Sequence, residues 1–571
     1  IIFLPAIALL AMIVPTFAQR EIAGYSWIVL SAIGTGFLSF GLWVHHMFTT
    51  GLPAVSLGFF SAASEAVAIP TGIQIFAFIA TVMLGRVVKS VPMLWCLGAL
   101  GTFIIGGLTG VMVAVAPFDF QAHDTYFIVA HLHYVLIGGM VFPVVAGVQY
   151  YYPFATGKAL SRKLGIWSFW LCLAGFNIAF MPMHLTGLLG MPRRVFTYSA
   201  ESGWFWLNLM SSVGAFIFAA GFLLFIWDCV RPKGKQPLIK RNVWNAGTLE
   251  WAGRVPSDPW GLRSIPTINS RYPLWDDKDL INVIDEGRGL LPHAEEGKRE
   301  TLITSVLDAQ PIQVLRVGTP SWIPMITAFG LGAVFIFMTY KWWFLVAAGG
   351  AVFFSGLMYW LWTGTAVIPE KETKDIGDGR ELPLYVSGSR SSGWWAMFIT
   401  MTGDLTAYLS LLFGYFFFWT IHEDFPPPGI EGPGWQWPLA SALLGLLAWG
   451  LTLGARETNR RGNVVLARFM LGGGIIASVL CGLALFAGPW STNLDPTMHA
   501  YPAIVWALVV WVLAHLAVGI IMQAYCLARS LWGKMTPRYD ADIWNVALYW
   551  HFNAFAAVLT PLVIGGFPLL L

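Results

Sequence analysis

The stretch that decides the fold is residues 124–152, DTYFIVAHLHYVLIGGMVFPVVAGVQYYY. After its first residue it contains no Asp, Glu, Lys or Arg, and its only ionisable side chains besides tyrosine are two histidines. An apolar run of about 20 residues is long enough to cross a bilayer as a helix. The stretch therefore predicts a membrane-spanning helix that carries His131 and His133.

The composition of the whole chain agrees with this prediction. Of its 571 residues, 57% are hydrophobic and 11% are charged, whereas charged residues make up about a quarter of a typical soluble domain. The 60 Gly, 29 Trp and 41 Phe residues favour a helical bundle with aromatic belts over a β-barrel. A soluble enzyme is excluded. The net charge of +3 without a basic tail predicts no nucleic-acid partner, and five scattered cysteines predict no disulfide framework.

Apolar runs divide the chain into two blocks of seven predicted spans. The first block, residues 1–230, has a truncated span at 1–15 and further runs near 25–50, 58–85, 93–116, 124–152, 164–187 and 203–229. Residues 231–320 contain no spanning run and are predicted to be a soluble linker. The second block, residues 321–571, has runs near 322–340, 342–363, 394–420, 437–455, 469–489, 503–528 and 544–571. The predicted fold class is all-α, a polytopic helical membrane protein with about 14 spans.

The charges of the loops predict an orientation. When the loops are placed alternately on two sides, all of the 33 Lys and Arg residues except Arg193, Arg194 and Lys341 fall on one side. The positive-inside rule assigns that side, with the linker, to the cytoplasm. The adjacent guanidinium groups of Arg193 and Arg194 suit an anionic ligand, with a generic surface pair as the alternative.

Four histidines within predicted spans are the main candidate site. His45 and His46 can share one metal only if it lies between them, and an interfacial, hydrogen-bonded pair is the alternative. His131 and His133 point about 200° apart on a helix, so each is expected to serve a different centre. Because unpaired ionisable groups are costly in hydrocarbon, we interpret these histidines as ligands.

A second candidate site lies at the outer rim of the same span as His131. His123 and Asp124 offer a nitrogen and oxygens, which suit a hard divalent ion that keeps some of its water. The alternative role for Asp124 is to cap the N-terminus of the helix.

A set of ordered motifs resembles subunit I of the haem-copper oxygen reductases, specifically of cytochrome c oxidase. The motifs are Val44–Phe48, Ile69–Gly72, His123–Tyr126, His131–Tyr134 and Met191–Arg194. The resemblance implies that His45 and His46 bind the active-site copper, that His131 is the axial ligand of the high-spin haem, and that His133 is an axial ligand of the low-spin haem. It further implies a magnesium site at His123 and Asp124, and haem-propionate contacts at Arg193 and Arg194.

The second block resembles subunit III of the same enzyme, fused behind the linker. The resemblance rests on Tyr549–Phe552 and His515–Gly519, and Thr248–Trp251 resembles the stretch that follows subunit I in fused bacterial chains. Asp404 lies within a span, where an intramembrane carboxylate is a functional candidate and a structural hydrogen bond is the alternative.

Two features depart from the family pattern. The His-Pro-Glu-Val-Tyr segment with the third copper ligand and the tyrosine is absent, as are the helices before it, so we interpret the chain as an N-terminally truncated fragment. Gln74 stands where the family usually places a proton-carrying lysine. Ser64, Thr71 and Gln74 fall within about 80° on an ideal helix and are expected to line a proton path, whereas Glu65 lies about 180° from Gln74.

Together these features predict a terminal respiratory oxidase in the bacterial cytoplasmic membrane, reducing O2 to water with electrons from cytochrome c and pumping protons. The implied cofactors are haem A, as low-spin heme a and high-spin heme a3, the active-site copper (CuB) and magnesium. The implied partners are cytochrome c, a separate subunit II with a dinuclear copper centre, small accessory subunits and membrane lipid. The alternatives are a quinol oxidase, a nitric-oxide reductase or a non-redox transporter whose histidines relay protons.

Overall fold

The computed structural model describes residues 2–231, 241–258, 261–292, 299–305, 308–318, 321–365 and 368–570. The chain divides into two compact units, Ile1–His293 (unit 1) and Ala294–Leu571 (unit 2). The division falls inside the predicted linker, and each unit is described separately below.

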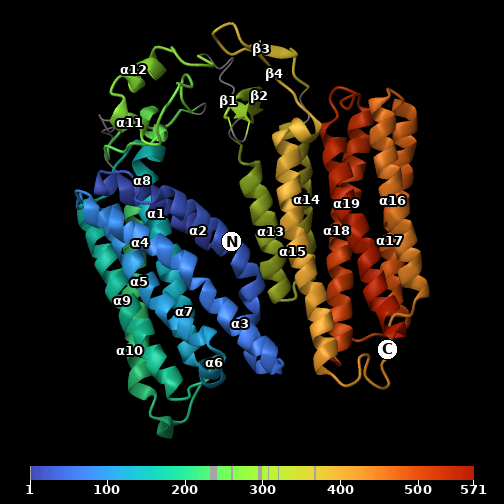
Figure 1. The fold of residues 1–571 in the computed structure, drawn as a ribbon, viewed down its shortest axis with the longest axis horizontal. Helices are drawn as coiled ribbons and strands as arrows, with labels where there is room; N and C mark the ends of the chain where they lie inside the picture. Colours follow the sequence, from blue (N-terminus) through green and yellow to red (C-terminus); the bar gives the residue numbers. More distant parts are fainter. Residues whose placement is uncertain are drawn as a thin grey trace. The chain divides into compact units, whose positions relative to one another are not determined.

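Unit 1 is a bundle of long helices with a small, irregular cap (Figure 1). Its bundle elements are α1 (Phe3–Ala18), α2 (Tyr25–Leu42), the 3-10 helix η1 (Trp43–Thr50), α3 (Ala54–Ala66), α4 (Ala68–Leu84), α5 (Val91–Ala114), α6 (Ala116–Ala122), α7 (Tyr126–Leu136), the π-helical turn η2 (Ile137–Val141), α8 (Phe142–Thr156), α9 (Arg162–Leu188), η3 (Ala200–Ser202) and α10 (Phe205–Val230). The cap contains η4 (Leu249–Ala252), α11 (Pro273–Asp276) and α12 (Leu280–Asp285).

The described residues of unit 2 form seven long helices and two short hairpins. The helices are α13 (Ile323–Thr339), α14 (Trp343–Thr365), α15 (Ser392–Ile421), α16 (Gln436–Arg460), α17 (Val464–Ser491), α18 (Ala500–Leu531) and α19 (Ala541–Pro561), the last followed by η7 (Leu562–Gly566) and η8 (Phe567–Leu569). Antiparallel β1 (Arg299–Thr304) and β2 (Pro311–Val317) form one hairpin. Antiparallel β3 (Thr373–Asp375) and β4 (Glu381–Pro383) form the other, and η6 (Gly388–Arg390) precedes α15.

The helices confirm the predicted fold class. Among the described residues, 12 helical segments are long and apolar enough to cross a membrane, and the two helices Phe3–Ala18 and Ile323–Thr339 are apolar but shorter. Several boundaries agree closely with the apolar runs, such as α9, which spans Arg162–Leu188 where a run at 164–187 was expected. The chain is an all-α, multi-pass membrane protein.

The helix that carries His131 and His133 packs closely against its neighbours because the facing positions are small. A methyl group at Gly106 of α5 would lie 2.8 Å from the backbone nitrogen of Val135 on α7, which is too close for any side chain. Helices in membranes use such small residues to bring their backbones together. The register between α5 and α7, and so the position of His131, therefore depends on this glycine.

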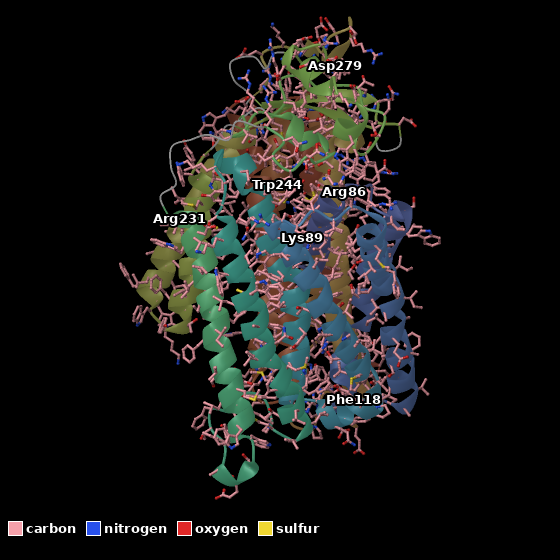
Figure 2. All side chains as sticks on the ribbon, turned by 90° about the vertical axis from the view of Figure 1, so that its left-hand side faces the viewer. Arg86, Lys89, Phe118, Arg231, Trp244 and Asp279 are labelled. Atoms are coloured by element: carbon pink, nitrogen blue, oxygen red, sulfur yellow. The ribbon has the colours of Figure 1, made fainter. Side chains whose placement is uncertain are left out.

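The first part of the predicted linker forms the cap on one end of unit 1. Trp251 is fully buried and stacks on Tyr151 with ring centroids 6.1 Å apart, while Trp244 donates a hydrogen bond from Nε1 to the carbonyl of Tyr150 at 2.8 Å. The view in Figure 2 places Trp244 and Asp279 at this end of unit 1 and Phe118 at the opposite end. Residues 241–258 and 261–292 therefore pack as part of unit 1.

The later part of the predicted linker belongs to unit 2. Glu300 of β1, whose side chain is almost fully buried, pairs with Arg316 of β2 at 3.0 Å and with Lys374 of β3. Because a buried carboxylate needs such cationic partners, these pairs join the two hairpins. The linker prediction described only the lack of a spanning run and missed this folding in two parts.

Candidate metal and cofactor site

The histidine pair lies on a change of helix type. The α-helix α2 ends at Leu42, and Trp43–Thr50 continues as a 3-10 helix. In this segment the Nε2 atoms of His45 and His46 approach to 3.1 Å, and Nδ1 of His45 lies 3.1 Å from the hydroxyl of Ser64. Two imidazole nitrogens that face one another in this way are placed to share one metal ion.

His131 is oriented by α5. Its Nδ1 lies 3.0 Å from the carbonyl oxygen of Gly106 and 3.2 Å from the hydroxyl of Thr109. Donation from Nδ1 to the carbonyl leaves Nε2 with its lone pair free, as metal-ligating histidines require. A methyl group at Gly110 would lie 2.9 Å from Cε1 of His131, so glycine leaves the room that the ring occupies.

His133 contacts a different helix from His131. Its Nδ1 lies 2.7 Å from the carbonyl of Val129, one turn earlier in α7, and its ring stacks on Phe180 of α9 with centroids 4.2 Å apart. Donation from Nδ1 again leaves Nε2 free. The two histidines of α7 therefore face different neighbours, α5 and α9, as the helical spacing predicts.

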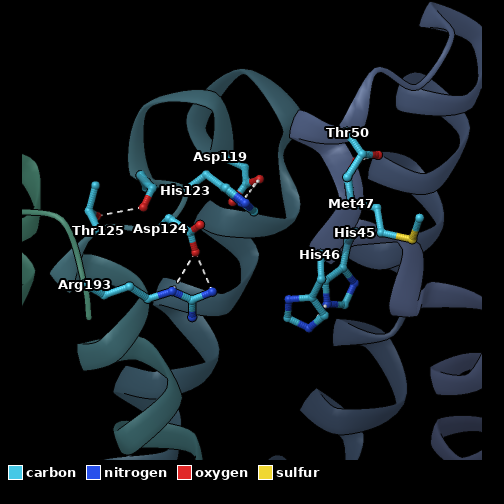
Figure 3. A network of polar contacts seen from close by, with 10 residues as sticks. His45, His46, Met47, Thr50, Asp119, His123, Asp124, Thr125 and Arg193 are labelled. Atoms are coloured by element: carbon cyan, nitrogen blue, oxygen red, sulfur yellow. Dashed lines mark hydrogen bonds and ion pairs between the residues drawn. The ribbon is translucent and has the colours of Figure 1, made fainter. Parts of the chain in front are cut away.

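The rim residues pair differently from the sequence prediction, which grouped His123 with Asp124. Nδ1 of His123 lies 3.2 Å from Asp119, and the carboxylate oxygen Oδ1 of Asp124 accepts hydrogen bonds from Nε and Nη2 of Arg193 at 2.6 and 2.5 Å (Figure 3). The helix cap is Thr125, whose side chain accepts from the backbone N–H of Phe127, so capping by Asp124 was wrong. Asp124 has a backbone φ of 54°, in the left-handed region that Asp adopts more readily than most residues.

Asp119 is the functional candidate that sequence reasoning missed. It is 3% exposed and lies on the short helix α6, four residues before His123. Burial raises the pKa of Asp119, and the neighbouring His123 partly offsets this shift. The signal in the sequence was an acidic side chain one helical turn before a histidine.

These side chains line one cavity of about 550 Å³ in unit 1. Its polar lining comprises His45, His46, Ser64, Thr71, Asp119, His123, Asp124, His131 and Arg193. The remaining lining is mostly apolar and comes from α4, α5 and α7. The volume lies within the range of cofactor and ligand sites. Figure 3 shows the rings of His45 and His46 facing the side that carries Asp124 and Arg193.

Three predicted site residues do not line this cavity. His133 lies on the side of α7 that contacts α9, and Arg194 is exposed at the rim with a φ of 67°. Gln74 is fully buried, and neither polar atom of its amide has a hydrogen-bond partner among the residues that the structure describes. Because α3 ends at Ala66 and α4 begins at Ala68, Ser64 and Gln74 lie on separate helices, and the ideal-helix angle between them does not apply.

The donor chemistry fits metal ions without completing a closed site. Imidazole nitrogens are suitable ligands for haem iron and copper. Within the described ranges, no three His, Cys, Asp or Glu side chains come close enough together to hold a metal ion. His45 and His46 therefore offer two nitrogen donors side by side, and not a complete set of metal ligands among the described residues.

Unit 2 holds one intramembrane carboxylate near a histidine. Asp404 on α15 lies 3.7 Å from Nε2 of His515 on α18. The ring of His515 stacks on Trp511 at 3.7 Å between centroids, and its backbone carbonyl accepts from Tyr549 at 3.1 Å. These contacts give His515 a packing role among the helices of unit 2 and place Asp404 beside it.

A family model described as "Cytochrome C and Quinol oxidase polypeptide I" matches residues 1–217. Cytochrome c oxidase subunit 1 of Bacillus subtilis (strain 168) is 38% identical over 332 residues, which cover 58% of this chain and 50% of that protein. The same subunit of Bacillus sp. (strain PS3) is 35% identical over 364 residues, covering 63% and 56%.

Quinol oxidases are similar to the chain as well. Quinol oxidase subunit 1 of Bacillus subtilis (strain 168) is 42% identical over 276 residues, covering 48% of this chain and 42% of that protein. The chain thus spans about half the length of the curated relatives that it matches.

Proposed function

We propose that this chain, whose residues 1–217 match the model of cytochrome c and quinol oxidase polypeptide I, carries the oxygen-reducing centre of a terminal respiratory oxidase of the haem-copper family. The observation that carries the proposal is the shared cavity, in which the His45–His46 pair and His131 are exposed to the same space. His133 does not line this cavity but faces α9, where its position suits a second haem.

The cofactors follow from these placements. His131 would hold the high-spin haem, His133 the low-spin haem, and His45 with His46 the copper CuB. When bound, such centres deliver electrons to O2 so that it is reduced to water without release of partly reduced oxygen. We propose haem A in both haem positions.

The protein's part is to hold and orient these groups. The carbonyl of Gly106 fixes the ring of His131, and Ser64 fixes the ring of His45, so both present a chosen nitrogen to the cavity. Arg193 places a guanidinium group in the cavity wall, where it suits the carboxylates of a haem. Its ion pair with Asp124 holds that guanidinium in place.

The rim retains donors for magnesium. Arg193 contacts only Oδ1 of Asp124, and His123 uses only Nδ1 for its contact with Asp119. Oδ2 of Asp124 and Nε2 of His123 therefore remain for a hard cation that keeps several waters. We propose that this ion stabilises the rim at which Arg193 and Arg194 lie.

The proposed electron donor is cytochrome c, reached through a separate subunit II with a dinuclear copper centre, and small accessory subunits complete the complex. The resemblance of unit 2 to subunit III supports this choice. The second candidate is a quinol oxidase, which the 42% identity to such a subunit favours. Oxygen consumption by the complete oxidase with reduced cytochrome c and with ubiquinol as alternative donors distinguishes them, and turnover with ubiquinol alone would refute the first.

The proposed location is the bacterial cytoplasmic membrane, with the residues of the predicted linker on the cytoplasmic side. The distribution of Lys and Arg supports this orientation. A cysteine placed at exposed Asp279 should react with an impermeant maleimide only in inside-out vesicles. Labelling from the periplasmic side of intact cells would reverse the orientation.

Proton delivery is proposed to run through hydroxyls and water, because Gln74 cannot ionise. Ser64 and Thr71 line the cavity, and the unpartnered amide of Gln74 suits buried water molecules, which usually satisfy such groups. Gln74→Lys in the complete, proton-pumping oxidase is expected to change the rate of haem reduction. An unchanged rate would show that proton uptake does not pass position 74.

A further inference from the structure

A second, smaller pocket lies in unit 1 where α5 and α9 begin. It has a volume of about 240 Å³, and residues from the segment before α5, the end of α8, the start of α9 and Trp244 line it. It shares no lining residue with the histidine cavity. In Figure 2, Lys89 and Trp244 lie at the capped end of unit 1, opposite Phe118 at the other end of the bundle.

Two long helices direct their N-termini to this pocket. Ser90 caps α5 by accepting a hydrogen bond from the N–H of Met93, and Ser161 caps α9 by accepting from Leu164. Other N–H groups of a first helical turn lack helical acceptors, and the helix dipole adds positive potential there. Helix N-termini are accordingly common sites for phosphate.

Two cationic side chains add to this potential. Lys89 and Arg162 both line the pocket and are exposed, and neither forms an ion pair with any described residue. The described lining contains no carboxylate. The nearby Asp228 accepts from the backbone N–H of Ser161 at 2.9 Å and pairs with Arg231 at 2.9 Å, so its charge is compensated beside the pocket.

The strongest sign of a ligand is Gln149. This side chain on α8 lines the pocket and is only 5% exposed. Its amide takes part in none of the side-chain hydrogen bonds among the described residues, and its polar atoms are not fully enclosed by protein. A methyl group at Gly165 would lie 3.4 Å from its Oε1, which places the amide against the first turn of α9. The amide is therefore accessible from the pocket that it lines, and a ligand in the pocket can supply the hydrogen bonds that such groups normally make.

We propose that this pocket binds a phosphate group, held by Lys89, Arg162, the amide of Gln149 and the helix N-termini. This goes beyond oxygen reduction and does not depend on it. The phosphate comes from one of two sources, the headgroup of an anionic phospholipid or inorganic phosphate. The apolar walls formed by Val91, Pro153 and Trp244 suit either the neighbouring part of a lipid or the closure of a small site.

The test uses the full chain in three forms. The test variant is Lys89→Gln/Arg162→Gln, and the matched control is Arg86→Gln/Lys163→Gln, which removes the same charge from exposed residues outside the pocket. Native mass spectrometry after reconstitution in phosphatidylcholine with phosphatidylglycerol counts the retained anionic lipids. Equilibrium dialysis of the delipidated chain with radiolabelled inorganic phosphate measures the soluble ligand.

Retention of one more phosphatidylglycerol by the wild type and control than by the test variant identifies a lipid headgroup. Inorganic phosphate binding that weakens by about tenfold or more in the test variant alone identifies the soluble source. Equal binding by test and control variants in both assays overturns the proposal.

Gln149→Met provides a second test of phosphate binding, one that does not change the charge of the pocket. Because the amide makes no internal hydrogen bond, this variant should keep the thermal stability of the wild type in phosphate-free detergent. It should also lose the stabilisation that the wild type gains from phosphatidylglycerol or phosphate. Full retention of that gain would exclude Gln149 from the site and contradict the proposal.

Discussion

Units 1 and 2 each bury a glutamine completely within apolar helices, and the surroundings of the two are opposite. Gln523 of unit 2 donates to Thr452 at 2.8 Å and accepts from Ser478 at 3.1 Å, which joins α16, α17 and α18. Gln74 of unit 1 has no partner for either amide atom within the described part of the chain. A buried amide with partners holds helices together, whereas a buried amide without them indicates an unmet need for water or ligand. Among the described residues, the buried glutamine of unit 2 thus links three helices, and that of unit 1 links none.

The largest expected effect follows from removing the ring that α5 orients. His131→Ala should abolish haem binding at the cavity and lower oxygen consumption by the complete oxidase by more than about 100-fold, because even residues that only orient a ligand contribute 10- to 100-fold. The absorption spectrum of the purified oxidase checks the haem. The control is His515→Ala in unit 2, and equal losses in the two variants would erase the distinction between the units.

The next effect concerns a buried ion pair of unit 2. Arg529, which is 4% exposed, contacts Asp542 at 2.5 Å, and Arg529→Ala leaves this carboxylate without its cation. We expect unfolding to become easier by about 3–5 kcal/mol, measured by thermal denaturation in detergent. Arg460→Ala, at an exposed pair with Glu457, is the control and should leave the melting temperature unchanged. A stability loss shared by both variants would point to a general charge effect.

Gln523→Leu tests the partnered glutamine. Removing the amide deprives Thr452 and Ser478 of one contact each, although both hydroxyls also bond to backbone carbonyls. Because side-chain hydrogen bonds in membranes contribute modestly, the expected loss is about 1 kcal/mol. Unchanged stability would show that this network does not hold the three helices.

Gln74→Leu is the matched substitution in unit 1 and should have the smallest effect on stability. No internal hydrogen bond is lost, so the melting temperature should stay the same or rise slightly. A loss as large as that of Gln523→Leu would reveal partners for Gln74 among the protein's own side chains. Paired measurements on the two variants thus sharpen the comparison directly.

Sequence periodicity predicts where the helices lie. It does not predict which side chains pair with one another in the folded chain. Apolar length predicts α9 to within a few residues because a bilayer imposes that length on any spanning helix. It does not predict the packing of Trp251 on Tyr151, because that contact joins segments about a hundred residues apart and depends on tertiary structure.

Helical spacing likewise predicts only part of the candidate site. The opposed directions of His131 and His133 follow from helical spacing alone. The pairing of His123 with Asp119 and of Asp124 with Arg193 does not, since it depends on the left-handed backbone at Asp124 and on a loop that returns from α9. Likewise, the interruption at Val67 between α3 and α4 separates Ser64 from Gln74.

The cap on unit 1 affects where a shortened product of the gene can end. A chain ended at residue 230, where the last helix of the first block stops, would expose the aromatic surface of Tyr150 and Tyr151 that Trp244 and Trp251 cover. Extending the same product through residue 292 keeps that cover. Of the two products, we expect the longer one to remain monodisperse and the shorter one to aggregate, so the practical end of the first unit lies well beyond its last membrane helix.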